Sequence, residues 1–293
     1  MLKRSVAPGR GQGPEHQLAV FPLSQQPLAE LTRATSIARG AAIDVARSTH
    51  ATDSINSIKP IHSDSRVLIT TFDLSAVELV LELSEGRGGL FVSDSPVPKY
   101  QPSGREPICI DVRSPSGRPM LARPADSHSP VAKSFWKRYQ KRLNALKRKP
   151  GAVDFRCDVW SIVLQAAADM VTESGSLTRP VDVENWYRGW SRYQMDSVSA
   201  RRCMLQSLGV ATGVRALDIP FALGQAWRVL APQIEALAKA RGARLAQQDM
   251  YVEVCTEMQR IALGPSPIAT AKLLSLLRAR ILTIGPSVEA TVR

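Results

Sequence analysis

The sequence predicts an α+β protein, with a small, mainly antiparallel β region followed by a larger α-helical domain of about five helices. Three observations predict this class. Residues 60–125 contain β-branched runs separated by turns, residues 131–286 contain segments of helical periodicity with capping signals, and a Pro- and Ser-rich linker at 126–130 separates the two. The chain has 293 residues, 44% of them hydrophobic, which is enough to build such cores.

The amino-terminal part of the chain is the least regular. Residues 1–26 are rich in Gly, Pro and Gln and include several basic residues, so we expect a flexible basic tail. Residues 27–125 form the predicted α/β region. It opens with apolar residues at helical intervals over 27–48, which predict a helix weakened by Gly40.

The small sheet is predicted from short runs of β-branched and apolar residues. Strands are expected at 66–72, 90–93 and 108–113. Residues 76–83 alternate apolar and polar side chains and favour another strand, although Leu and Glu also favour a helix, which stays the alternative. Turn residues at 114–117 predict a hairpin that pairs residues 120–123 with the preceding strand.

Five helices are expected between residues 131 and 286, because capping residues precede each periodic segment. The expected start signals are Ser129 with Pro130, Asp154, Asp182, Asp218 with Pro220, and Ser266 with Pro267. The expected stops are Pro150, Gly175, Gly209, Leu263 and Gly285. Pro232 should kink or break the fourth helix, and residues 287–293 form a tail.

The positive charge is concentrated in one segment. The net charge is +12, and residues 131–151 carry eight basic side chains with no acidic one. These side chains are Lys133, Lys137, Arg138, Lys141, Arg142, Lys147, Arg148 and Lys149. A concentrated block of this kind creates a local potential that attracts anions, whereas evenly spread charge serves solubility.

The same segment is amphipathic when drawn at 100° per residue. Phe135, Trp136 and Tyr139 fall on one side with Leu143 and Leu146, and almost all basic residues fall on the other. The apolar side predicts packing on the helical domain. The basic side is either merely solvated or binds a polyanion, and the absence of compensating acids favours binding.

Two further segments could extend such a surface. Arg188 and Arg192 lie among aromatic residues in the predicted third helix, and Arg201 and Arg202 follow. Arginine mixed with aromatic side chains suits stacking on nucleic-acid bases. However, Trp186 and Trp190 have the helical spacing of core residues, which is the simpler interpretation.

Signatures of catalysis, metals and secretion are absent from the sequence. There is no phosphate-binding loop of the P-loop type, no zinc-protease motif and no nucleophile elbow, so we expect no enzyme, cofactor or metal. Four cysteines, about fifty residues apart, predict reduced buried thiols. With no apolar leader and no apolar stretch long enough to span a bilayer, we expect an intracellular protein, cytoplasmic or nuclear.

The sequence therefore favours a non-enzymatic protein that binds DNA or RNA through largely sequence-independent phosphate contacts from the basic helix. An accessory protein of a virus or mobile element would have this character. Two alternatives stay open, namely a peripheral membrane or matrix-like protein that binds anionic lipid, and an interaction scaffold for an acidic protein. A homo-oligomer is compatible with each of them.

Overall fold

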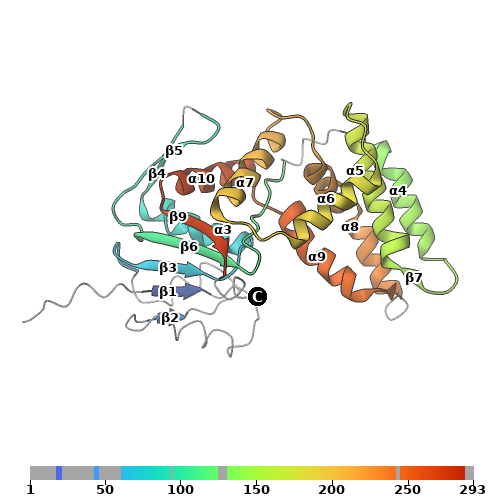
Figure 1. The fold of residues 1–293 in the computed structure, drawn as a ribbon, viewed down its shortest axis with the longest axis horizontal. Helices are drawn as coiled ribbons and strands as arrows, with labels where there is room; N and C mark the ends of the chain where they lie inside the picture. The colour runs from blue at the N-terminus through green and yellow to red at the C-terminus, as the bar shows by residue number, and fades with distance from the viewer. Residues whose placement is uncertain are drawn as a thin grey trace, which may run out of the picture.

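A computed structural model describes residues 61–93, 95–124, 131–241 and 245–287, together with the backbone of two strands at Leu18–Phe21 and Ile43–Val45. Figure 1 shows a sheet on one side of the molecule and a group of helices on the other. The α+β class is confirmed. The number of helices is not, because the described residues contain eight α-helices, α3 to α10.

Among the described residues, the main sheet has five strands in the order β2-β1-β3-β6-β9, and every neighbouring pair is parallel. The described strands besides Leu18–Phe21 (β1) and Ile43–Val45 (β2) are Arg66–Ile69 (β3), Cys109–Ser114 (β6) and Leu282–Pro286 (β9). Buried residues alternate with less buried ones along β3 and β6. This order is that of doubly wound sheets of the flavodoxin type.

The prediction of a mainly antiparallel sheet is therefore wrong, and the cause lies at residues 74–82. Leu74–Glu82 is a helix (α3), because the Asp73 side chain caps its N-terminus by accepting a hydrogen bond of 2.9 Å from Ala76 N. The helix carries the chain back along the sheet, so β6 enters parallel to β3. A short 3₁₀ turn at Glu85–Arg87 (η1) follows. Strands Leu90–Val92 (β4) and Lys99–Gln101 (β5) form an antiparallel pair.

Two other expectations for the β region are also corrected. Residues 120–123 do not pair with β6, because the backbone N–H groups of Leu121 and Arg123 donate instead to the carbonyls of Arg260 and Pro265. Ile43–Val45 is a strand, so the predicted helix at 27–48 is wrong at these residues, and the rest of it lies outside the described residues. The flexible tail predicted for residues 1–26 is likewise wrong at Leu18–Phe21, which forms a strand of the main sheet, and its other residues lie outside the described residues.

The described residues of the helical part contain seven α-helices. They are Lys133–Leu146 (α4), Ser161–Glu173 (α5), Pro180–Arg192 (α6), Ser197–Ala211 (α7), Ile219–Arg241 (α8), Gln248–Ala262 (α9) and Pro267–Arg278 (α10). A π-helical turn at Phe155–Trp160 (η2) precedes α5, and a two-stranded parallel pair joins Val153–Asp154 (β7) to Leu245–Ala246 (β8).

Several predicted caps are confirmed. Asp154 accepts a hydrogen bond of 2.7 Å from Cys157 N, Asp218 accepts one of 3.0 Å from Phe221 N, and Ser266 accepts one of 3.2 Å from Ala269 N. The helix α4 starts at Lys133 after Ala132, whose side chain makes no cap, while Ser129 and Pro130 lie outside the described residues.

The helices predicted to be long are divided differently in the structure. The third begins at Pro180 after Arg179, so Asp182 lies in its first turn and is not the N-cap that was predicted. It also splits into α6 and α7, because Asp196 caps a new helix through a 2.8 Å hydrogen bond from Ser199 N. The helix α8 runs unbroken through Pro232, since its buried residues pack against α4, α5 and α9 and offset the lost hydrogen bond. The fifth helix ends at Arg278, and Leu282–Pro286 form β9 instead of continuing the helix.

The sheet and the helical part share one hydrophobic core. Helix α10 packs against α3, α7 and β9, so the end of the chain returns to the sheet (Figure 1). Among the described helices, none has both the length and the apolar character required to cross a membrane. The four cysteines are free; Cys157 is exposed and the other three are half-buried, so the prediction that the thiols are buried is wrong for Cys157 and holds only in part for the others.

Candidate polyanion-binding face

Helix α4 lies at the edge of the helical part, and its apolar side is anchored in the core (Figure 1). Phe135, Trp136, Tyr139 and Leu143 are all buried, and the helix packs against α5 and α8. The rings of Phe135 and Trp136 meet edge to face with 4.8 Å between their centroids. The predicted amphipathic helix is confirmed, and its orientation relative to the core is fixed by these aromatic side chains.

The opposite side of α4 and the residues just after it form what we call the α4 basic face. All eight of its side chains are exposed: Lys133, Lys137, Arg138, Lys141, Arg142, Lys147, Arg148 and Lys149. Lys133, Lys137 and Lys141 are each four residues apart, so they form one row with about 6 Å between neighbours along the helix axis. No acidic residue lies in the first turn to offset their repulsion.

Arg138 is the one member of this face that is paired with α5. Its guanidinium lies 3.1 Å from the Asp169 carboxylate and 3.9 Å from that of Glu173, and it stacks on the rings of Phe135 and Tyr139. The Tyr139 hydroxyl also donates to Asp169. Burial and this hydrogen bond to a carboxylate raise the pKa of Tyr139. Arg138 is thus positioned mainly by packing and pairing within the protein.

Lys149 is paired at the other end of the segment. Its ammonium lies 2.6 Å from Asp158 in the π-helical turn. Although burial raises the pKa of Asp158, the hydrogen bond from Lys149 and one from Asp154 N bring it below its ordinary value. The exposed ion pair contributes little to stability, and the lysine can exchange it for another anion.

Arg241, from the end of α8, adds a further cation beside the basic face. It donates to the carbonyl oxygens of Leu146 and Lys149 at 2.5 and 2.6 Å and to that of Gly151 at 3.2 Å. A cation at the carboxyl end of α4 interacts favourably with the helix dipole. Arg241 therefore holds the end of the segment in place.

The remaining six cations of the α4 basic face have no ion pair within the described parts of the chain: Lys133, Lys137, Lys141, Arg142, Lys147 and Arg148. Two of the eight cations are compensated by the protein itself, and six are open to solvent. Lys141 and Arg142 have no ion pair among the described residues, whereas Arg138 and Lys149 are paired. The face keeps a strong positive potential.

The four extension residues lie on other helices. Arg188 and Arg192 are exposed on α6, and Arg201 and Arg202 are exposed on α7. Arg188 pairs with Glu184 at 2.7 Å, so it is partly neutralised. Trp190 is buried and Trp186 half-buried, as expected of core-facing residues. Helix α5 packs against both α4 and α6. Arg188 and Arg192 on α6 therefore lie on a different helix layer from the α4 basic face.

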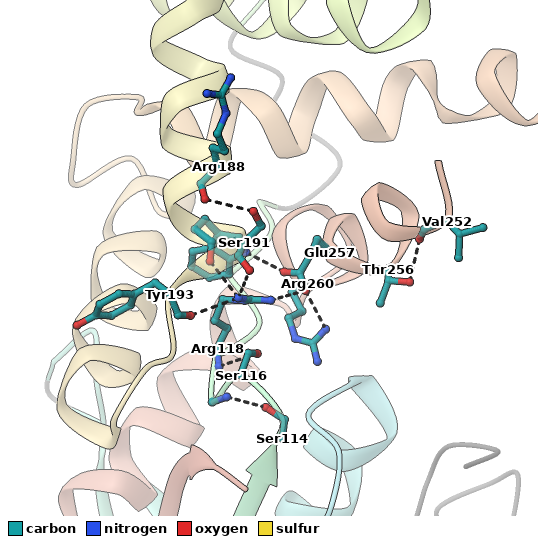
Figure 2. A network of polar contacts seen from close by, with 12 residues as sticks. Ser114, Ser116, Arg118, Arg188, Ser191, Tyr193, Val252, Thr256, Glu257 and Arg260 are labelled. Atoms are coloured by element: carbon teal, nitrogen blue, oxygen red, sulfur yellow. Dashed lines mark hydrogen bonds and ion pairs between the residues drawn. The ribbon is translucent and has the colours of Figure 1, made fainter. Parts of the chain in front are cut away.

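A buried polar network lies where α6, α9 and the segment after β6 meet (Figure 2). The Arg118 guanidinium contacts the Glu257 carboxylate at 2.7 Å and donates to the carbonyl oxygens of Trp190, Ser191 and Tyr193. The indole N–H of Trp190 donates to the other carboxylate oxygen of Glu257 at 3.0 Å. The network joins three segments that are far apart in the sequence.

This network was not predicted, although the sequence contains one signal of it. Glu257 follows Val254 and precedes Met258 and Ile261 on the side of α9 that is buried. A carboxylate within an apolar stripe needs a buried partner, and this pattern could have marked Glu257. Nothing local marked Arg118 as that partner, because 139 residues separate the two.

No protein-family model matches the chain, and no curated protein matches its sequence. Within the part of the chain that the structure describes, no group of three or more His, Cys, Asp or Glu side chains could hold a metal ion.

Proposed function

We propose that the α4 basic face binds nucleic acid through contacts to its phosphates, without base-specific readout. The observation that carries this proposal is a set of six exposed cations with no ion pair among the described residues. Four of them lie on α4 and two just after it, and the other side of this helix is fixed in the core. The lysines and arginines would replace counterions condensed on the nucleic acid, and the bound phosphates would remove the repulsion between neighbouring lysines, so binding gains from both effects.

The spacing of the lysine row suits a phosphate backbone. The row from Lys133 to Lys141 spans about 12 Å at 1.5 Å per residue. One strand of DNA places a phosphate about every 3.4 Å along the duplex axis, so the row spans three to four phosphates. Because Lys and Arg here contact only phosphates, DNA and RNA would both bind.

Burial of the aromatic side favours nucleic acid over a membrane surface. A helix that docks on lipid inserts its apolar side into the interface, but Trp136 is 4% exposed and Tyr139 is 1% exposed. Insertion would require α4 to leave the core. An acidic protein segment stays an alternative partner, and the competition experiment below distinguishes it from nucleic acid. An intracellular location accords with the four free cysteines.

The test measures the binding constant of the full-length protein at a series of salt concentrations. Fluorescence anisotropy of labelled duplex DNA or single-stranded RNA reports the binding. If four phosphates are neutralised, log K should fall with log salt at a slope of about −3.6 for the duplex and about −2.8 for the single strand. Two competitors for the labelled nucleic acid represent the alternatives: polyglutamate stands for an acidic protein, and vesicles rich in anionic lipid stand for a membrane surface.

The decisive variant replaces the unpaired cations Lys133, Lys137, Lys141 and Arg148 by Gln. A matched control removes the same charge elsewhere by replacing the exposed residues Lys99, Arg123, Arg278 and Arg280 by Gln. We expect the first variant to flatten the slope towards zero and the control to keep most of it. If the slope flattened equally in the two variants, only the net charge of the protein would matter for binding, and the α4 basic face would not be the site. An affinity for polyglutamate equal to that for nucleic acid would favour an acidic protein partner.

A further inference from the structure

A pocket of about 360 Å³ opens between α6, α7 and the start of α8. Its base is formed by Leu121 and Ala122 from the extended segment after β6 and by Ile261 from α9. Aromatic side chains form much of the wall: Trp186, Trp190, Tyr193 and Phe221. This volume and this apolar lining are typical of sites for small organic molecules.

The charges at the pocket restrict what it can bind. Among the described residues that line it, Asp218 is the only charged one, and none of them is Lys, Arg or His. Phosphates and carboxylates would lack a counter-charge and would be repelled by the Asp218 carboxylate. The pocket therefore has the opposite preference to the α4 basic face, and an occupant is neutral or positively charged.

The Asp218 carboxylate has spare acceptor capacity. Its Oδ1 caps α8 by accepting from Phe221 N, while Oδ2 accepts no hydrogen bond from another residue in the described chain. Burial raises the pKa of Asp218, and the nearby Arg215 and the hydrogen bond from Phe221 oppose this change. A cation bound at Oδ2 would offset the cost of burying the carboxylate.

Within the aromatic wall, the Trp186–Trp190 pair is held in place by contacts with the protein. Trp186 and Trp190 stack with 5.6 Å between ring centroids and 23° between ring planes. Trp190 is anchored through its indole N–H to Glu257, which Arg118 holds in turn (Figure 2). A rigid stack offers flat faces to an aromatic ligand and a negative π surface to a cation.

We propose that this pocket binds a small organic cation, an ammonium group carried on a flat apolar body. The ammonium would lie at Asp218 Oδ2 and against the aromatic rings, and the body would occupy the space between Phe221 and the Trp186–Trp190 stack. The inference rests on the pocket alone and does not depend on nucleic-acid binding by α4.

The test compares three probes of one size and different charge, using calorimetry at pH 7 with the full-length protein. These are 2-phenylethylamine, which is a cation, 2-phenylethanol, which is neutral, and phenylacetate, which is an anion. We expect the cation to bind about tenfold more tightly than the alcohol, and the anion not to bind. Equal binding of cation and alcohol, or no saturable binding of the cation, would overturn the proposal.

Two substitutions locate the binding within the pocket. Asp218→Asn keeps the cap of α8, because Asn is as good an N-cap as Asp, and it should abolish the preference for the cation over the alcohol. Trp186→Leu should weaken both probes together. Asp64→Asn removes an exposed carboxylate outside the pocket and should change neither affinity. If Asp218→Asn binds the cation as the wild type does, the assignment of the carboxylate is wrong.

Discussion

Replacing Arg118 by Met removes the cation that links α6, α9 and the segment after β6. Both Arg118 and Glu257 are 7% exposed, so the substitution leaves a carboxylate buried in the core. The carbonyls of Trp190, Ser191 and Tyr193 also lose their donor. Breaking a buried ion pair on one side costs about 3–5 kcal/mol of unfolding free energy.

The expected loss lies at the lower end of that range. The Arg260 guanidinium is already 3.9 Å from Glu257 and can compensate part of the charge, and the indole N–H of Trp190 still donates to it. We therefore expect Arg118→Met to lower the unfolding free energy by about 3 kcal/mol. With a urea m-value of about 3 kcal/mol/M, the midpoint should fall by about 1 M.

Urea denaturation followed by circular dichroism measures this loss, and a double-mutant cycle shows its cause. Glu257→Leu leaves Arg118 uncompensated and should cost a similar amount. The double variant Arg118→Met with Glu257→Leu buries no charge, so its loss should be smaller than the sum of the single losses by about 2 kcal/mol. A loss below about 1 kcal/mol for Arg118→Met, or additive losses, would refute the view that the buried pair controls stability here.

Three further predictions concern stability. Gly264→Ala should destabilise the protein by about 1–3 kcal/mol in urea denaturation, because a Cβ there would lie 1.9 Å from the Leu121 carbonyl oxygen; an unchanged midpoint would contradict this close approach. Asp73→Ala should cost about 1 kcal/mol in the same assay and Asp73→Asn much less, because only the alanine removes the cap of α3. Burial raises the pKa of Glu106, but hydrogen bonds from Ser103 N and the Tyr100 hydroxyl lower it to about 2. The ionised Glu106 therefore contributes fully to the free energy of unfolding above its ordinary pKa of 4.5, and this contribution is lost as the pH falls from there towards 2. The difference in midpoint between wild type and Glu106→Gln should therefore shrink between pH 5 and pH 3, and a constant difference would exclude this linkage.

Much of the local structure could be predicted because its causes are local. The amphipathic pattern of α4 depends on spacing within fourteen residues, and the caps at Asp154, Asp218 and Ser266 depend on a side chain three residues from the N–H it accepts. The positive charge of the α4 basic face could likewise be predicted, since no acidic residue occurs within the segment.

Errors arose where a local pattern suited two structures. Residues 76–83 combine alternating polarity with strong helix formers, and Asp73 as a cap decides for the helix. Residues 281–286 continue the apolar character of α10, but β6 offers a free edge on which Leu282 and Ile284 become buried. The break between α6 and α7 had a signal in Asp196, which the longer periodic pattern concealed.

The sequence by itself determined that a basic, amphipathic helix forms and which of its sides is apolar. Only the tertiary structure decided the direction of the strands, the pairing of Arg138 with Asp169, and the joining of Arg118, Trp190 and Glu257 beside the aromatic pocket. Periodicity, capping and charge act within a few residues. Pairing and cavity formation depend on groups up to 139 residues apart, which only the folded chain brings within contact.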